Sequence, residues 1–274
     1  MQDKLLQDLK WNQWLAGVID GDGCFSTANR HSVAQFSITM NYLDERCLYG
    51  IKQKIGGSVK LQSGSAAVRL RLSSKVHLSQ LVARVNGLSL NSIRTDQLKI
   101  VCQRLGINYC NSTSFSWQSS YASGLFDSDG TVTISVKKHR SIDNLPGLEG
   151  KIQRLKNACE TQLSIKITQK FKHNIQFLCT PLDLDTGKLK IPFGAIHFDK
   201  SQNGYYSWYI TSRQDMLAFC NYIRQNPSRT VKMHRLRLIP LYYELWSQKP
   251  GLAAVGSALQ KRWFDFAESW FKYS

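Results

Sequence analysis

The spacing of apolar residues predicts two helices at corresponding places in the chain. One apolar face recurs at the i, i+3, i+4, i+7 and i+8 positions of a helix. Its members are Trp11, Trp14, Leu15, Val18 and Ile19. A looser stripe is formed by Trp117, Tyr121, Leu125 and Phe126. Ser114 and Ser116 precede this second stripe, and we predict that they supply its N-cap.

Strict alternation of apolar and polar residues predicts strands after each helix. The clearest runs are residues 35–39, 68–72 and 131–137, so each sheet should have one apolar and one polar face. Helical spacing returns near 75–86, 93–104, 213–225 and 232–247, and we expect these helices to cover the apolar faces. A last helical face lies within 258–272, which we interpret as core packing rather than a partner site. It consists of Leu259, Trp263, Phe266, Ala267, Trp270 and Phe271.

The chain repeats itself, which predicts one fold written twice. Residues 14–25 align with 121–132 at an offset of 107. The shared motif residues are Gly17, Asp20, Asp22 and Gly23 in the first copy and Gly124, Asp127, Asp129 and Gly130 in the second. Later segments of the two halves align at offsets of 129 and 138. Relative to the first half, the second half therefore carries insertions of 22 and 9 residues. We predict repeats over 1–105 and 117–274, joined by a polar linker at 106–116.

The charge balance favours a polyanionic partner. The 36 lysines and arginines exceed the 19 acids, giving a net charge of +17 that solubility alone does not require. Nucleic acid is the first candidate and an anionic membrane surface the second. No run of 18 apolar residues is present and the first residues lack an apolar h-region, so we expect neither a membrane span nor a retained signal peptide. Seven cysteines without a CxxC pair indicate reduced, small buried residues in an intracellular protein.

Two pairs of small residues predict close packing of the two motif helices. Gly17 and Gly21 lie four residues apart in the first helix, as Gly124 and Ser128 do in the second. Small side chains at this spacing form a groove in which two helix backbones approach each other. We also expect each helix to end at the last glycine of its motif, in a positive-φ conformation.

Helix packing about a pseudo-twofold axis would bring Asp22 and Asp129 together. Two carboxylates at helix C-termini repel each other, and a hard cation such as Mg²⁺ relieves that repulsion. Its oxygen ligands would include the backbone carbonyls of Gly21 and Ser128. Metal-assisted phosphodiester hydrolysis is a reaction that needs both an acidic pair and a basic surface.

Two simpler interpretations of the motif compete with a catalytic role. A single Asp-Gly motif is more often a helix-ending turn, but two copies in matched contexts favour a catalytic role. Residues 127–130 also look like the start of a calcium-binding EF-hand loop. That interpretation fails, because the required Gly and Glu fall on Val132 and Lys138, and on Phe25 and His31 in the first copy.

Residues 15–23 and the weaker copy at 122–130 resemble the nine-residue motif of the LAGLIDADG homing endonucleases, in their single-chain, two-repeat form. The resemblance implies an α+β fold with one αββαββα unit per half, and two saddle-shaped antiparallel sheets with helices on one face. By position, it implies a catalytic pair in Asp22 and Asp129. It also implies that Arg94, Lys232 and Gln169, with Lys170 beside it, organise solvent near the scissile phosphates.

The first half departs from that pattern. Met40 stands where the second half has Gln169, and a thioether cannot order water as an amide can. Either Asn41 substitutes, or the two strands are cut at unequal rates. Arg94 in place of a lysine stays charged and acts only electrostatically. We therefore hypothesise asymmetric active sites.

Outward polar residues of the two sheets are expected to contact DNA, since a two-stranded ribbon fits the major groove. Basic residues of the insertion near 138–156 are expected to contact phosphates; they are Lys138, Arg140, Lys151, Arg154 and Lys156. The predicted DNA-contacting set is Ser26, Arg30, Gln35, Ser37, Lys60, Arg69, Arg71, Thr133, Ser135, Lys137, Lys166, Lys170, Lys188, Lys190, Ser207 and Tyr209.

The resemblance implies a monomeric, site-specific double-strand DNA endonuclease that uses Mg²⁺, with Mn²⁺ substituting and Ca²⁺ binding without cleavage. It implies a staggered cut with 3′ overhangs in a target of about two helical turns. Intron homing, the host intron RNA as a second partner and an organellar location, mitochondrion or chloroplast, are further implications. An RNA maturase or a non-cleaving DNA-binding regulator of the same fold is the alternative. Retention of both acids and both cations favours the nuclease.

Overall fold

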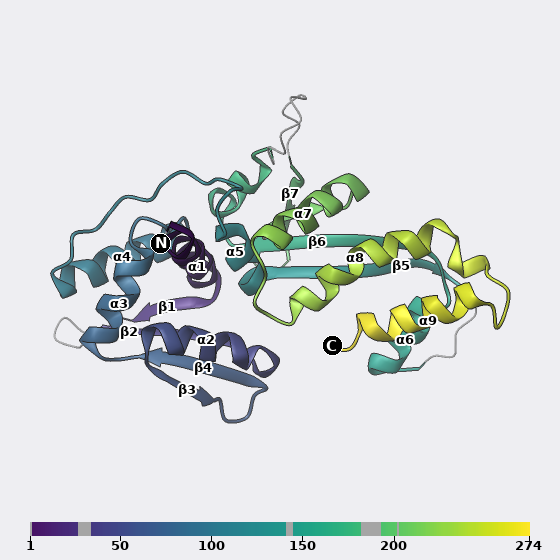
Figure 1. The fold of residues 1–274 in the computed structure, drawn as a ribbon, viewed down its shortest axis with the longest axis horizontal. Coiled ribbons are helices and arrows are strands. Elements are labelled where there is room, and N and C mark those ends of the chain that lie inside the picture. The colour runs from purple at the N-terminus through teal and green to yellow at the C-terminus, as the bar shows by residue number, and fades with distance from the viewer. Residues whose placement is uncertain (1, 27–33, 141–144, 182–192, 202) are drawn as a thin grey trace.

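Two α+β halves meet along two central helices in the computed structural model (Figure 1). The structure describes residues 2–26, 34–140, 145–181, 193–201 and 203–274. The central helices are α1 (Gln2–Asp22) and α5 (Tyr121–Asp129), which carry the two motifs. In Figure 1 they lie between the two sheets, so the motifs occupy the junction of the halves.

The first half is a four-stranded antiparallel sheet in the order β1-β2-β4-β3. Its strands are β1 (Gly23–Ser26), β2 (Gln35–Asn41), β3 (Ser58–Leu61) and β4 (Ala67–Leu72). Its further helices are the short 3-10 turn η1 (Tyr42–Asp44), α2 (Glu45–Ile55), α3 (Lys75–Val85) and α4 (Ser92–Leu105). The last two occupy the ranges that the apolar spacing predicts.

The second half repeats this sheet in the order β5-β6-β8-β7, which confirms the two-repeat α+β prediction. Its strands are β5 (Gly130–His139), β6 (Ala158–Gln169), β7 (Ala195–Asp199) and β8 (Tyr205–Ile210). Its helices are α6 (Gly147–Lys156), α7 (Arg213–Gln225), α8 (Lys232–Ser247) and α9 (Ala258–Trp270). Its 3-10 segments are η2 (Lys172–Asn174), η3 (Gln176–Cys179) and η4 (Pro250–Leu252).

The second half departs from the αββαββα order in two places. The insertion near 138–156 forms α6 between β5 and β6, and α6 packs against α9. Where the first half has α2, the second half has η2 and η3. The insertions therefore enlarge the second sheet and its helical cover, and leave the arrangement of the strands unchanged.

The strand registers confirm the offset of 129 residues that aligns β2 with β6. In each half, the last glycine of the motif pairs with an isoleucine of the next strand. The pairs are Gly23 with Ile38 and Gly130 with Ile167. Positions 40 and 169 each follow two residues later, so Met40 and Gln169 are structurally equivalent.

The core lies between each sheet and its helices. Along β2 the side chains of Phe36, Ile38 and Met40 are buried, while the alternate residues face outward. The predicted apolar face near the C-terminus is core packing, because Trp263 and Trp270 in α9 are buried. Burial of a large aromatic side chain contributes a few kcal/mol to folding, on the order of 3.

Two local predictions about the motif helices are wrong. Helix α5 begins at Tyr121, so Ser114 and Ser116 do not cap it. Gly130 has a φ of −82°, and Gly23 is not among the positive-φ residues. Both positions are glycine for lack of space, since an added Cβ would lie 2.6 Å from the carbonyl oxygen of Ile19 or 2.4 Å from that of Phe126.

Residues 106–116 contain no helix or strand and follow α4 toward the second half (Figure 1). Trp117, just beyond, donates from Nε1 to the carbonyl of Thr180 at 2.8 Å and contacts the ring of Trp208. The chain therefore enters the core of the second half at Trp117.

The structure also tests the predictions about buried cysteines and membrane-spanning helices. Three cysteines are buried, but Cys24 and Cys110 are exposed, so the prediction that each is buried is wrong there. Within the described ranges no disulfide forms. No helix in the described part of the chain is both long and apolar enough to cross a bilayer.

Candidate active site at the junction of the repeats

Backbone contact between α1 and α5 depends on two glycines. A Cβ at Gly17 would lie 2.1 Å from the carbonyl oxygen of Tyr121, and one at Gly124 would lie 1.9 Å from that of Trp14. No larger residue fits at either place without separating the helices. The predicted close packing of the motif helices is therefore present.

The first acid of each motif holds the two repeats together. Tyr121 in α5 donates its hydroxyl to Asp20 in α1 at 2.6 Å, and Trp14 in α1 donates Nε1 to Asp127 in α5 at 2.8 Å. Both carboxylates are buried, and burial raises the pKa of Asp20 to about 6. Because they are saturated with protein donors, they have a structural role. Their other donors are Ser89, Leu90 and Asn91 for Asp20, and Ser228, Arg229 and Thr230 for Asp127.

The second acid of each motif lies at a helix C-terminus, largely withdrawn from solvent. A Cβ at Gly21 would be 2.6 Å from Asp129 Oδ2, which places the acid of α5 against the end of α1. Burial raises the pKa of Asp22 to about 6, and burial with repulsion from Asp22 raises that of Asp129 to about 7. The predicted convergence of Asp22 and Asp129 is therefore seen.

Each motif helix ends against a cation. Lys232 Nζ donates to the carbonyl oxygens of Asp127 at 2.7 Å and Ser128 at 2.8 Å. Arg94 Nη2 reaches the carbonyl of Gly21 at 3.5 Å, and its buried Nε has no partner among the described residues. Burial lowers the pKa of Lys232, although the carboxylates around it oppose that shift. Both cations thus lie where the macrodipole is negative.

Gln169 contacts Asp129 directly. Its Nε2 donates to Asp129 Oδ2 at 2.6 Å, and its Oε1 accepts from Asn91 Nδ2 at 3.1 Å. The equivalent Met40 is buried and has no polar atom to offer. Asn41 does not substitute, because it is exposed and its Oδ1 accepts from the Leu43 amide at 3.0 Å to cap η1.

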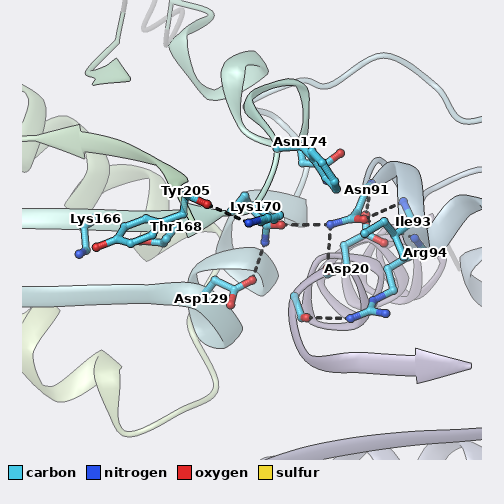
Figure 2. A pocket seen from close by; sticks show the side chains of 14 residues that line it. Asp20, Asn91, Ile93, Arg94, Asp129, Lys166, Thr168, Lys170, Asn174 and Tyr205 are labelled. Carbon is cyan, nitrogen blue, oxygen red and sulfur yellow. Dashed lines mark hydrogen bonds between the residues drawn. The ribbon is translucent and has the colours of Figure 1, made fainter. Parts of the chain in front are cut away.

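We name the two sides of the junction by these residues. The Gln169 side comprises Asp129, Gln169, Arg94 and the Gly21 carbonyl. These groups line a cleft of about 490 Å³ that also reaches Lys170 (Figure 2). The Met40 side comprises Asp22, Lys232, Asp44, Met40 and the Ser128 carbonyl, with Lys232 and Asp44 acting electrostatically on Asp22.

The donor set fits a hard divalent cation. No described residue donates a hydrogen bond to Asp22, and Asp129 receives one only from Gln169. Two poorly solvated carboxylates with raised pKa values are electrostatically unfavourable without a cation. Within the described residues, no cluster of three or more His, Cys, Asp or Glu side chains offers a competing site.

The polar face of the first sheet presents most of the residues predicted there. Ser26, Gln35, Lys60 and Arg71 are exposed, while Ser37 and Arg69 are partly exposed. In the register, Ser37 lies opposite Arg71, and Lys60 opposite Arg69. The prediction missed three neighbours on this face, which the two-residue period would have included: Cys24, Thr39 and Ser58.

The second sheet presents a more aromatic face. Thr133, Ser135 and Lys137 are exposed, and the Lys166 ammonium lies 5.8 Å from the ring centre of Tyr209. It also lies 6.0 Å from the ring of Tyr205, a residue that the sequence interpretation missed. The sequence interpretation also missed four residues that pair across strands with predicted residues of this face: Thr131, Ser164, Thr168 and His197.

Some predicted DNA contacts do not fit the structure. Ser207 is 1% exposed and bonds to Thr168 at 3.0 Å, so it is not presented to a ligand. Lys156 is ion-paired with Glu268 at 2.7 Å rather than free for phosphate. Lys170 donates to the Asn203 carbonyl at 2.9 Å but is exposed at the cleft, so its contact with DNA stays a prediction. Three predicted contacts lie outside the described residues: Arg30, Lys188 and Lys190.

Comparison with known proteins identifies the motif. The family model described as LAGLIDADG endonuclease matches residues 15–103 and 122–242, one segment in each half. A probable intron-encoded endonuclease, aI2, from Debaryomyces hansenii is 34% identical over 99% of this chain. The intron-encoded RNA maturase bI4 of Saccharomyces cerevisiae is 34% identical over 96%. This chain spans 39% and 37% of their respective lengths.

A solved structure shares the fold. Meganuclease I-SmaMI, bound to uncleavable DNA, superposes with a TM-score of 0.61 at 17% sequence identity. The match covers 94% of this chain and 97% of that one. Nearly the whole two-repeat architecture is therefore shared.

Proposed function

This chain belongs to the LAGLIDADG endonuclease family, and from that premise we propose that it is a site-specific double-strand DNA endonuclease that acts as a monomer. The observation that carries the proposal is the convergence of Asp22 and Asp129 at two helix ends, each flanked by a cation. Two motifs in one chain supply two such positions, one for each DNA strand. The polar faces of the two sheets provide the surface for a duplex.

Mg²⁺ is the proposed metal, with Mn²⁺ substituting and Ca²⁺ binding without cleavage. The residues that would hold it are Asp22 and Asp129, with the backbone carbonyls of Gly21 and Ser128. When bound, the metal supplies Lewis-acid stabilisation of charge at the scissile phosphate. A related structure of I-SmaMI with its uncleaved DNA target was obtained with calcium ions.

The remaining groups act through charge and orientation. Lys232 and Arg94 offset the negative charge that develops on the phosphate, in a site where low solvent access strengthens their effect. Gln169, which lines the cleft, fixes the orientation of Asp129 through its 2.6 Å hydrogen bond. Arg94 cannot exchange protons at neutral pH, so its contribution is electrostatic only.

We propose that the two sheets lie in successive major grooves of a target of about two helical turns. The two motif helices would then face the intervening minor groove, where staggered cutting leaves 3′ overhangs. We propose a repeat organisation of 1–105, 106–116 and 117–274, with the linker bridging the two sheets. The names of the relatives as intron-encoded proteins support a homing role and an organellar location.

RNA maturation is a second candidate function, favoured by one observation. A relative that is 34% identical over 96% of this chain is named an RNA maturase. The host intron RNA would then be a second partner. Splicing would not need the acidic pair, so Asp22→Asn should remove cleavage and leave splicing unchanged.

Cleavage of a randomised duplex library tests the proposed function. We expect the wild type to select and cut one family of sites in Mg²⁺ or Mn²⁺, and to bind those sites without cutting in Ca²⁺. Asp22→Asn should bind the same sites and lose cleavage by at least about 1000-fold. Asp20→Asn is the matched control within the motif, and it should lower stability by about 2 kcal/mol. A wild type that binds a site tightly and never cuts it in either metal refutes the proposal.

A further inference from the structure

Helix α8, which carries Lys232 as its first residue, is capped from the opposite repeat. Its N-cap residue is Val231, and no side chain of its own segment accepts a capping hydrogen bond. The acceptor is Asp44 of the first half, whose Oδ1 lies 2.7 Å from the Val231 amide nitrogen. Asp44 is 8% exposed, so this contact is shielded from water.

The second half makes a similar contact with the first half, but through a side-chain amide rather than a carboxylate. Asn174 Oδ1 accepts from the amide of Ser92, the first residue of α4, at 3.0 Å. Asp44 ends η1 and Asn174 ends η2, and each 3-10 turn follows the strand that ends beside the junction. Each repeat therefore holds the start of the helix that carries the other repeat's cation.

The two contacts differ in how much depends on them. Helix α4 has its own cap, since Asn91 Oδ1 accepts from the amides of Ile93 and Arg94 at 3.0 and 3.3 Å. Helix α8 depends on Asp44, whose carboxylate also suits the positive end of the helix dipole. The charge of Asp44 acts on Lys232, Asp22 and Asp127, and among the two second acids of the motifs it acts on Asp22 and not on Asp129.

We propose that Asp44 is a positioning residue for Lys232, which it holds from the opposite repeat through the Val231 amide and through its charge. Asn174 has the same role for Arg94, with less dependence on it because Asn91 already caps α4. The inference rests on the proposed function. It adds to that function an assignment of each positioning residue to one DNA strand. Asp44 governs the strand served by the Met40 side, and Asn174 governs the other.

Strand-resolved nicking of a duplex recovered from the library tests this proposal. The two 5′ ends carry different fluorophores, and rate constants are measured at saturating protein in Mg²⁺. Lys232→Met identifies the strand served by Lys232, and Arg94→Met identifies the other. Asp44→Ala should slow the Lys232 strand by about 10-fold to 100-fold and the other strand by less than about threefold. Duplex affinity in Ca²⁺ should stay within about threefold.

Two further variants keep the test independent of a folding defect. Asp44→Asn retains an acceptor for the Val231 amide and loses the charge, so it should fold and slow the same strand by a smaller factor. Asn174→Ala should slow the opposite strand, and by less than Asp44→Ala slows its own. Chemical denaturation of each variant checks that the protein is folded under the assay conditions.

The outcomes separate this inference from the proposed function. A wild type that cuts neither strand of its selected duplex overturns both. If the wild type cuts both strands, equal slowing of the two by Asp44→Ala overturns the positioning role alone. An unchanged strand ratio in folded Asp44→Asn and Asp44→Ala does the same.

Discussion

The Gln169 side and the Met40 side of the junction share a frame and differ in the groups around their carboxylates. On the Gln169 side, the amide of Gln169 contacts Asp129 and the cation is a guanidinium. On the Met40 side, a buried thioether replaces the amide and the cation is a lysine. Asp44 adds a second carboxylate there.

The difference shows which parts of a duplicated site are constrained to be alike. The helix crossing and the Asp20 and Asp127 hydrogen bonds join the two repeats, so a change in one copy disturbs the other. In the proposed complex, the side chains beside Asp22 and those beside Asp129 serve different strands. They are free to diverge, which permits unequal strand rates while the fold is retained.

Substitution of the crossing glycines should break the shared frame and have the largest effect. Gly17→Ala and Gly124→Ala each place a Cβ about 2 Å from a backbone carbonyl oxygen. We expect each to destabilise the protein by at least about 4 kcal/mol, measured by urea denaturation. Gly50→Ala is the control, because nothing lies within 4 Å of its Cβ in α2, and it should be neutral or stabilising by about 0.5–1 kcal/mol. A much smaller loss at one crossing glycine than at the other would show that the two contacts are not equivalent.

The pH dependence of stability should reveal the electrostatic difference between the two acids. Their folded pKa values, about 6 for Asp22 and about 7 for Asp129, lie above the ordinary value of 3.8. Between about pH 4 and 7 the folded state therefore holds more protons than the unfolded state, so stability falls as pH rises through this window. We expect the two acids together to cause a loss of ~4 kcal/mol between pH 5 and 8 in chelator, partly reversed by Mg²⁺.

A double variant controls the pH experiment. Asp22→Asn with Asp129→Asn should remove most of the slope and leave the part due to Asp20, whose pKa is also raised to about 6. Asp129→Asn alone should remove more of the slope near pH 7 than Asp22→Asn alone. Stability that rises from pH 5 to 8 in the metal-free protein would contradict these assignments.

Exchange of Gln169 and Met40 should make the two sides of the junction alike. Gln169→Met removes the hydrogen bond to Asp129, and we expect nicking of one strand to slow by about 10-fold to 100-fold. Met40→Gln should speed the other strand by a smaller factor. The measurement is a strand-resolved nicking time course. Equal strand rates in the wild type would argue against the asymmetric-site hypothesis.

Thiol protection should give the smallest effect and tests whether both sheet faces contact DNA. Cys24 is exposed on the first sheet, directly after the motif glycine, and Thr131 holds the matching exposed place on the second. Bound duplex should slow alkylation of Cys24 by about 10-fold, and that of the cysteine in Thr131→Cys equally. Cys110, exposed in the linker, is the internal control and should stay reactive. Protection of only one of the two cysteines would show that only one sheet face contacts the duplex.

The architecture could be predicted from sequence because it depends on periodic patterns. The two-residue and 3.6-residue periods identify strands and helices, and the repeat shows that the two halves share one order. Local exceptions could not be predicted. The start of α5 depends on where Trp117 and Tyr121 meet the core, and the helix-ending glycines depend on space rather than on φ.

The site could be predicted only in part. The positions of Asp22, Asp129, Arg94, Lys232 and Gln169 follow from the motif and the offsets, and the structure brings all five to one junction. The contacts of Asp44 and Asn174 were missed, because each joins residues of different repeats. The pattern of a single repeat gives no signal for such a contact.

A duplicated, basic α+β chain with two acidic motifs can be recognised from the order of its residues alone. Periodicity, composition and repetition are properties of the residue order along the chain, so they can be recognised without a structure. Only the tertiary structure decided which acids are structural and which are exposed to a cation. That distinction depends on the donors that long-range packing brings to each carboxylate: Asp20 and Asp127 are saturated by donors from both repeats, whereas Asp22 and Asp129 are left nearly without partners.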